Sequence, residues 1–496
     1  MNQRNNQAIT SFDSSEKGQF GDVLTRRFQQ SPMKVGFLGL GYFEYWRMYP
    51  QLREIVRNDL DGVWQRLKDV LAGFEVIYPG MVDTLDRAEE AGAKFAAENV
   101  EALIIAEGTY IPDFITLHAV NRAGNNPRII LFNSQTGSDL SPNDDYMATM
   151  RNSALIGISQ LTGSFDKTKL RYEVVCGEIS DPKVYGEIKG LLAAYRSVKK
   201  LKNSTYGLVG HVFRGMFDLE FDKAKVKGFL GPEVMTIQPE HLLSCWQEVQ
   251  ADAVNGVAEK LFRRFKSKKI DLDDVKRSCR VGLAMKKLHE KYNLDGLCFL
   301  GQHYLEKMTG APARMGASLM LEQDRIMVAC EGDIAGLAMM QLMHDFTGNV
   351  PFQAEWGQFD CRHNALFLLG HGIASPEIAK SDPEVTLTAS PEEWGFKGSG
   401  LNYEMIMKPG QVTMGHFLNT GESWRMFISE GEAIEFPCLP CDEIHAMVKV
   451  ETPVVDYIKS VLRHGVAHHL ILVHGHIADE LAAVADCMRI DKLILR

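Results

Sequence analysis

Four side chains in the second half of the sequence could hold a metal ion together. Each lies in an apolar or glycine-flanked segment, where an unpaired charge would be costly: Glu331 in AlaCysGluGlyAsp, Glu355 in AlaGluTrpGlyGln, His371 in LeuGlyHisGly and His469 in AlaHisHisLeu. Two carboxylates and two imidazoles favour a divalent ion such as Mn²⁺, Co²⁺ or Mg²⁺ over a thiolate-seeking one. Such an ion is a Lewis acid for hydroxyl and carbonyl oxygens.

Taken singly, these residues have ordinary structural explanations. Glu331 would be an acid at a helix N-terminus, Asp333 the N-cap of that helix, and His371 a hydrogen-bonded core histidine. The four residues in one order, with GluGlyAsp and HisHis around them, favour a metal site instead.

Composition bounds the class of protein. The 496 residues exceed a single core and suffice for about three domains. A net charge of −10 argues against a nucleic-acid partner, which needs a clustered basic face. The sequence has no apolar run of the ~18 residues that a membrane span requires, and its polar start has no signal-peptide core. Nine scattered cysteines favour a reducing cytoplasm.

Alternating strands and helices are expected from residue 33 onward. Continuous apolarity in short runs indicates strands buried on both faces, and hence a parallel sheet covered by helices. We expect a flexible extension over 1–32 and a Rossmann-like α/β domain over 33–204. Its expected strands are 34–40, 74–78, 102–106 and 128–132, and its expected helices include 51–73 and 83–99.

A second Rossmann-like parallel-sheet domain is expected over 205–350. Its strands are predicted at 206–210, 229–232 and 296–299, and its helices at 239–266 and 271–292. The last part, 351–496, changes character, because 406–417 and 423–435 alternate with the period of two that is typical of antiparallel strands. It predicts a β-barrel or a sandwich, and we expect a C-terminal β-barrel-like domain with helices around 452–463 and 476–488.

The metal-site motifs resemble those of the L-arabinose isomerase family, within the L-fucose/L-arabinose isomerase superfamily. CysGluGlyAsp precedes a helical segment, Glu355 stands 16 residues before His371 at the end of LeuLeuGlyHis, and HisHis precedes an apolar strand and a further histidine. The resemblance implies a cytoplasmic aldose–ketose isomerase, an intramolecular oxidoreductase that binds Mn²⁺, with Co²⁺ or Mg²⁺ as alternatives. It also implies a homo-oligomer, a trimer or hexamer, and a small sugar as substrate.

By the same resemblance, Glu331 and Glu355 are the proton-transfer residues and bind the metal together with His371 and His469. An aldose–ketose isomerase moves a proton between C2 and C1 of an open-chain sugar through an enediolate, whose negative charge a divalent ion stabilises. One glutamate moves the carbon proton and the other assists the hydroxyl proton transfers, and which does which stays open. A sugar epimerase or lyase could use the same enolisation site, and a non-catalytic sugar-binding protein would share two α/β domains.

Five further residues are expected to contact the substrate. The resemblance places Gln135 and Met216 in the pocket, and His468 is expected beside them. Gln302 and His303 follow the strand 296–299, where α/β sheets place ligand contacts.

Two contacts of the family are replaced in this sequence. AlaLeuIleGly at 154–157 stands where the family has AlaHisGly, and Gly357 stands where it has an aromatic residue. Loss of the imidazole and the space left by Gly357 favour a sugar other than L-arabinose.

Overall fold

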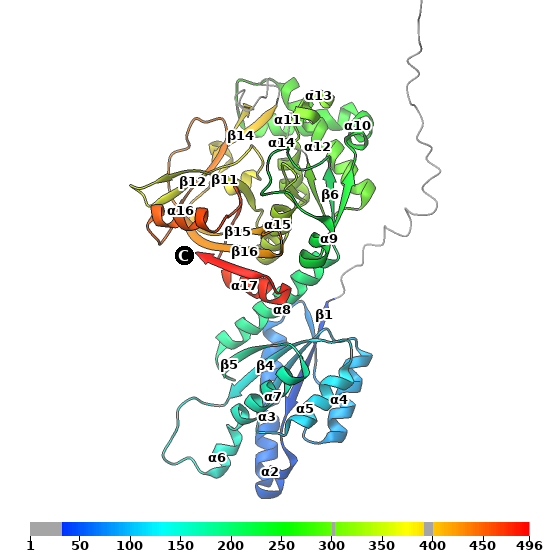
Figure 1. The fold of residues 1–496 in the computed structure, drawn as a ribbon, viewed down its shortest axis with the longest axis vertical. Coiled ribbons are helices and arrows are strands. Elements are labelled where there is room, and N and C mark those ends of the chain that lie inside the picture. The colour runs from blue at the N-terminus through cyan, green and yellow to red at the C-terminus, as the bar shows by residue number, and fades with distance from the viewer. Residues whose placement is uncertain (1–31, 300–302, 391–399, 496) are drawn as a thin grey trace, which may run out of the picture. The chain divides into compact units, whose positions relative to one another are not determined.

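The computed structural model describes residues 32–299, 303–390 and 400–495 of the chain. The chain divides into one unit over Gln29–Arg196 and another that contains Ser197–Arg496. Both combine helices with β-sheets, so the predicted α/β class is confirmed (Figure 1). The predicted extension over 1–32 lies outside the described residues, apart from Pro32.

The N-terminal unit contains a parallel sheet of five strands in the order β2-β1-β3-β4-β5. The four predicted strands are confirmed, and β5 is an addition. Its strands are β1 (Met33–Leu40), β2 (Phe74–Ile77), β3 (Ala102–Glu107), β4 (Arg128–Gln135) and β5 (Tyr172–Glu178). Its helices are α2 (Phe43–Met48), α3 (Pro50–Val70), α4 (Leu85–Ala97), α5 (Asp113–Ala123), α6 (Tyr146–Arg151) and α7 (Ala154–Thr168), and α8 (Pro182–Lys202) follows them.

A buried carboxyl group stands at the carboxyl end of this sheet. Glu107 ends β3 with 0 % of its surface exposed, and neither of its carboxyl oxygens has a hydrogen-bond partner among the described residues. It fits beside α7 only because residue 157 is glycine: a Cβ added there would lie 1.7 Å from Oε2 of Glu107. Burial, helped by the negative charge of Asp113, raises the pKa of Glu107 well above its ordinary value.

A second parallel sheet, of order β10-β9-β6-β7, opens the other unit. The predicted strand at 229–232 is wrong. Val226–Leu230 form a π-helical turn that ends at Gly231, whose φ is 106°, and the strand starts only after Pro232. The sheet consists of β6 (Thr205–Val209), β7 (Glu233–Ile237), β9 (Gly296–Phe299) and β10 (Met327–Ala329).

The helices around this sheet match the prediction in part. The long helix predicted over 239–266 is divided at Glu248–Gln250, whereas the one over 271–292 is confirmed and begins with a capping box at Asp271. The helices are α9 (Lys223–Lys225), α10 (Pro239–Gln247), α11 (Ala251–Arg264), α12 (Leu272–Tyr292), α13 (His303–Thr309), α14 (Arg314–Leu319), the π-helical η3 (Met320–Asp324) and α15 (Ile334–Thr347).

Six strands of the C-terminal part close into a barrel, as predicted. The ring runs β16-β15-β18-β11-β12-β17, and β17 pairs back with β16. Its strands are β11 (Phe352–Asp360), β12 (Ala365–Leu369), β15 (Gly410–Asn419), β16 (Trp424–Ala433), β17 (Ile444–Lys449) and β18 (His469–His474). The same sheet continues through β8 (Lys266–Lys268), β13 (Thr386–Ala389), β14 (Leu401–Ile406) and β19 (Asp491–Leu495), with helices α16 (Val454–Arg463) and α17 (Ala478–Met488) nearby.

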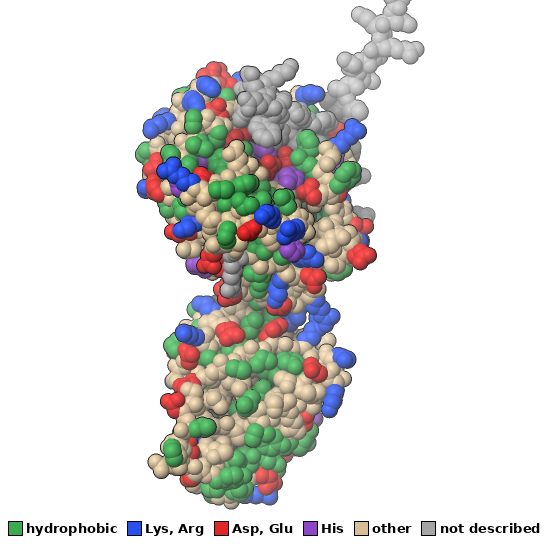
Figure 2. Space-filling model, turned by 60° about the vertical axis from the view of Figure 1, so that its left-hand side comes forward, with side chains coloured by type: hydrophobic (Ala, Val, Ile, Leu, Met, Phe, Trp, Pro, Cys, Tyr) green, Lys and Arg blue, Asp and Glu red, His purple; other side chains and the backbone are tan. Residues whose placement is uncertain are grey.

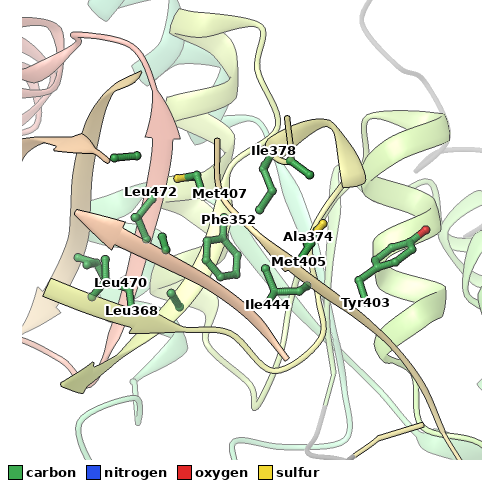
Figure 3. Close-up of a cluster of buried hydrophobic side chains, with 14 of the residues drawn as sticks. Phe352, Leu368, Ala374, Ile378, Tyr403, Met405, Met407, Ile444, Leu470 and Leu472 are labelled. Carbon is green, nitrogen blue, oxygen red and sulfur yellow. The ribbon is translucent and has the colours of Figure 1, made fainter. Parts of the chain in front are cut away.

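A hydrophobic cluster fills one face of the barrel strands (Figure 3). Phe352 and Ala354 of β11 belong to it, together with Leu470 and Leu472 of β18. Because successive side chains of a strand point to opposite faces, the intervening residues Gln353, Glu355, His469 and Ile471 point the other way. Helix α15 packs against β11, β15 and β18. The alternation therefore directs polar side chains of two neighbouring strands to the face opposite this cluster.

Candidate metal centre

The GluGlyAsp motif forms the turn between β10 and α15. Glu331 and Gly332 both have left-handed backbone conformations, with φ of 61° and 80°. Only glycine fits at 332, because a Cβ there would lie 2.5 Å from Cα of Val212. Asp333 caps α15, since its Oδ1 accepts from the backbone N–H of Gly336 at 2.7 Å. A left-handed backbone is strained for glutamate, and such strain is tolerated at functional sites. In this turn the left-handed conformation places the Glu331 carboxylate at the start of α15.

The sheet register and the end of β12 bring the other three predicted metal ligands to this carboxylate. Glu355 of β11 lies directly opposite His469 of β18, and His371 follows β12. Nε2 of His469 lies 3.1 Å from Oε2 of Glu331 and 3.7 Å from Oε1 of Glu355. Nε2 of His371 lies 2.6 Å from the same Oε1 of Glu355. The four residues predicted from the sequence thus form one cluster.

His468 joins this cluster. Ligand atoms of Glu331, Glu355, His468 and His469 all lie within 4.8 Å of one another. Nδ1 of His468 lies 2.6 Å from Oδ2 of Asp218, which also accepts from the His468 backbone N–H at 3.1 Å. The buried Nε2 of His468 has no hydrogen-bond partner within the described part of the chain. With Nδ1 committed to Asp218, this nitrogen is left for a ligand.

Neighbouring imidazoles keep both glutamates ionised. Burial alone would raise the pKa of Glu331, but the hydrogen bond with His469 and the charges of His371 and His469 lower it below its ordinary value. Burial likewise opposes the ionisation of Glu355, and the hydrogen bond and charge of His371 outweigh it. Burial would lower the pKa of His469, yet its hydrogen bonds to Asp333 and Glu331 raise the pKa to about 10. Two ionised carboxylates and an unpartnered imidazole nitrogen are a donor set that fits a divalent cation.

Asp333 has a role beyond that of a helix cap. It is wholly buried, and its Oδ2 accepts hydrogen bonds from Nδ1 of His469 at 2.9 Å, Nε2 of His416 at 3.0 Å and Nε2 of Gln353 at 3.2 Å. A carboxylate on Nδ1 fixes the ring of a metal-binding histidine and leaves Nε2 for the ion. Sequence analysis missed this role of Asp333 and did not include Gln353, His416 or Asp218.

Of the other predicted substrate contacts, one lies in a segment bonded to the cluster, one lies in the N-terminal unit, and two are not described. Met216 is half-buried in the segment after β6, which is tied to the cluster twice: Phe213 N–H donates to the Glu331 carbonyl at 3.0 Å, and Asp218 contacts His468. Gln135, half-buried, ends β4 in the N-terminal unit. Gln302 and the side chain of His303 lie outside the described residues.

The structure shows where the two replaced family contacts lie. Leu155 and Ile156 lie in the first turn of α7 with 55 % and 58 % of their surface exposed. Gly357 lies at an irregularity in the pairing of β11 with β12, and a Cβ there would be 2.9 Å from the ring of Phe367. The expectation that Gly357 leaves free space is therefore wrong, because Phe367 occupies it.

Comparison with known proteins points to sugar isomerases. No protein-family model matches the chain. The sulfoquinovose isomerase of Alkalicoccus urumqiensis is 22% identical over 314 residues, which cover 63% of this chain and 70% of that protein. The sulfoquinovose isomerase of Priestia aryabhattai is 19% identical over 298 residues, 60% of this chain and 65% of that protein. The match thus spans about two thirds of these relatives' length, and it supports an isomerase acting on a sugar rather than the L-arabinose isomerase family in particular.

Matches among solved structures are weak. An arabinose binding protein from Geobacillus stearothermophilus is 12% identical, with coverage of 63% of this chain and 87% of that chain and a TM-score of 0.14. A D-threo-3-hydroxyaspartate dehydratase from Delftia sp. HT23 is 11% identical, with coverage of 88% and 92% and a TM-score of 0.12. TM-scores this low give no evidence of a shared fold.

No helix in the described ranges is long and apolar enough to cross a membrane.

Proposed function

We propose that the protein is a metal-dependent aldose–ketose isomerase that acts on a free sugar through an enediolate. The observation that carries this proposal is the cluster of Glu331, Glu355, His468 and His469, whose ligand atoms lie within 4.8 Å of one another. Similarity to sulfoquinovose isomerases supports the same reaction class.

In this proposal Glu331, Glu355, His371 and His469 hold the divalent ion, Mn²⁺ first and Co²⁺ or Mg²⁺ as alternatives. His468 offers a further donor through its unpartnered Nε2. When bound, the ion stabilises the negative charge of the enediolate. An ionised carboxylate beside the reacting carbons can take a proton and return it to the neighbouring carbon. Glu355 has 23% of its side chain exposed against 6% for Glu331, so a sugar reaches Glu355 more easily.

The proposed substrate is a sugar other than L-arabinose. Sulfoquinovose is the first sugar to test, because the similar proteins are isomerases of that sugar. The absence of the family's imidazole from 154–157 also disfavours L-arabinose, since a buried hydroxyl group left without its partner costs about 1–3 kcal/mol. Met216 and His468 are the proposed contacts near the metal, and Gln135, Gln302 and His303 stay proposed contacts from the sequence.

The experiment that tests the proposal is a sugar panel with and without metal. Sulfoquinovose, L-arabinose, D-galactose, L-fucose and D-arabinose are each incubated with the chelated protein and with the Mn²⁺-loaded protein, and ketose formation is followed by NMR. We expect a ketose from at least one sugar, only in the loaded sample. An epimer or an elimination product would identify an epimerase or lyase, and binding without turnover a sugar-binding protein. Turnover that survives exhaustive chelation would refute metal dependence.

We further propose that the working unit is a homo-oligomer, a trimer or hexamer, in the cytoplasm. Large apolar side chains are exposed in the N-terminal unit. Figure 2 shows hydrophobic side chains at the lower end of this unit, where Figure 1 places α2. Apolar patches of this kind mark protein–protein contacts, and here a second copy of the chain is the proposed partner. The exposed large apolar residues of the N-terminal unit include Met48, Phe114, Tyr146, Leu155 and Ile156. The nine free cysteines agree with a reducing compartment. Light scattering of the active sample tests this, and a fully active monomer would contradict it.

A further inference from the structure

Several carboxylates contact the histidines of the proposed metal centre. Glu331, Asp333 and Glu355 each accept a hydrogen bond from one of these histidines, and Asp218 contacts His468. The first three are the least exposed, with 6%, 0% and 23% of their side chains exposed against 42% for Asp218. Buried charges are costly unless they are compensated. Within the described ranges, no lysine or arginine forms an ion pair with any of the three carboxylates.

His416 of β15 is a further imidazole that contacts Asp333. Its side chain is 1% exposed, with Nδ1 2.8 Å from the Phe417 carbonyl oxygen and Nε2 3.0 Å from Oδ2 of Asp333. A carbonyl and a carboxylate can only accept hydrogen bonds, so each ring nitrogen of His416 faces a group to which it can only donate.

The position of Asp333 between His416 and His469 is fixed from all sides. Its Oδ1 is held by the N–H of Gly336, so Oδ2 is the oxygen that the two rings share. The amide of Gln353 also has a defined orientation, because its Oε1 accepts from the backbone N–H of Cys330 at 3.0 Å and its Nε2 faces Asp333. A change at His416 is thus transmitted through one carboxylate to the ring of a proposed metal ligand.

We propose that His416 is a doubly protonated positioning residue of the metal centre, which acts through Asp333 to orient His469. The inference rests on the proposed function only in that the site binds a divalent ion. Partners of metal ligands at this remove change metal affinity by about 10–100-fold when they are substituted. We expect an effect of that size at His416, although its ring contacts none of the proposed metal ligands.

Two substitutions separate the charge from the hydrogen bond. His416→Gln keeps an N–H donor and loses the charge, and His416→Leu loses both. His445 of β17 is the matched control, because it is equally buried but its Nε2 accepts from the N–H of Leu439 and burial lowers its pKa, so its ring is neutral. The Mn²⁺ dissociation constant of each chelated protein is measured by calorimetry, and the Tm is measured with and without Mn²⁺.

The expected result is about 10–100-fold weaker Mn²⁺ binding for His416→Gln, and a loss at least as large for His416→Leu. As Mn²⁺ affinity falls in these variants, the rise in Tm on adding Mn²⁺ should become smaller. His445→Gln should instead change the metal-free Tm and keep the wild-type Mn²⁺ dissociation constant. Wild-type affinity in His416→Gln would overturn the inference while the proposed function stands. A wild-type protein that binds no Mn²⁺ would instead overturn the proposed metal site.

A measurement on the wild-type protein covers the case in which the variants fail to fold. Nitrogen NMR of the Mg²⁺-loaded protein, labelled with ¹⁵N at histidine, reports whether each ring nitrogen carries a proton. We expect one buried imidazolium with two protonated nitrogens in the loaded protein. Spectra in which all buried rings are neutral would refute the assignment of charge to His416.

Discussion

Replacing Gly157 by alanine should destabilise the N-terminal unit, although alanine is the better helix former. A Cβ at this position in α7 would lie 1.7 Å from Oε2 of Glu107 and 2.6 Å from its Cδ. Glu107 is wholly buried at the end of β3, so its carboxyl group has no solvent to move into. Overpacking costs about 1–3 kcal/mol, and removing a helical glycine returns about 1 kcal/mol. We therefore expect a net loss of up to about 2 kcal/mol in the free energy of unfolding.

A double-mutant cycle with Glu107→Ala isolates the clash. Removing the carboxyl group should make room for the new methyl group, so the two substitutions should couple favourably by about 1–3 kcal/mol. Urea unfolding followed by circular dichroism measures the four proteins. Gly163→Ala, in the same helix but with nothing within 4 Å of the added Cβ, is the control and should gain up to about 1 kcal/mol. Additive effects at 107 and 157, or equal stabilities of Gly157→Ala and Gly163→Ala, would refute the reasoning.

Three further predictions concern the metal centre and the buried acid. Chelation should abolish turnover and lower the Tm, and restoring free Mn²⁺ to 100 times its dissociation constant should return about 2.7 kcal/mol of stability, which calorimetry with elemental analysis can check. Glu331→Gln and Glu355→Gln should each fold and lose about 10²–10⁴-fold in kcat, so near-native turnover in either variant would exclude that residue as a proton-transfer group. Because the pKa of Glu107 is raised in the folded state, its contribution to stability is fully present below the unfolded pKa and declines as pH rises above it, by up to about 1.4 kcal/mol per pH unit. Glu107→Gln should flatten that decline in urea titrations across pH, and parallel curves for the two proteins would contradict the prediction.

Elements with a strong periodic signal could be predicted from the sequence. The strand predicted at 102–106 is buried throughout, as its unbroken apolarity indicated, and the alternation in 406–417 and 423–435 marked barrel strands. The failures have local causes. Gly231 and Pro232 separate a π-helical turn from the strand that follows, so the apolar residues before them were assigned to the wrong element. The helix break at Glu248–Gln250 contains no glycine or proline, so nothing in the sequence indicated it.

The residues of the candidate site were likewise predictable only where a local motif marked them. Glu331, Glu355, His371 and His469 could be selected because their motifs are local, and the structure brings them together. Gln353 was within reach of the sequence, since it stands two residues before Glu355 and so shares its face of β11. His416 gave no such signal, and Asp218 was marked only by lying two residues after the predicted pocket residue Met216. They reach Asp333 and His468 only through the packing of distant segments, which one sequence does not encode in any local pattern.

Strand β18 completes both the barrel and the proposed metal centre, so the metal centre can form only when the barrel has closed. This strand lies between β11 and β15 and carries His469, which is separated from Glu331 by 138 residues. Until β18 inserts, β11 and β15 are open edges that can pair with another chain, and the cluster lacks its central imidazole. A chain interrupted before residue 469 would therefore be both metal-free and prone to aggregate. Metal content per mole of protein would then report the fraction of molecules whose barrel has closed.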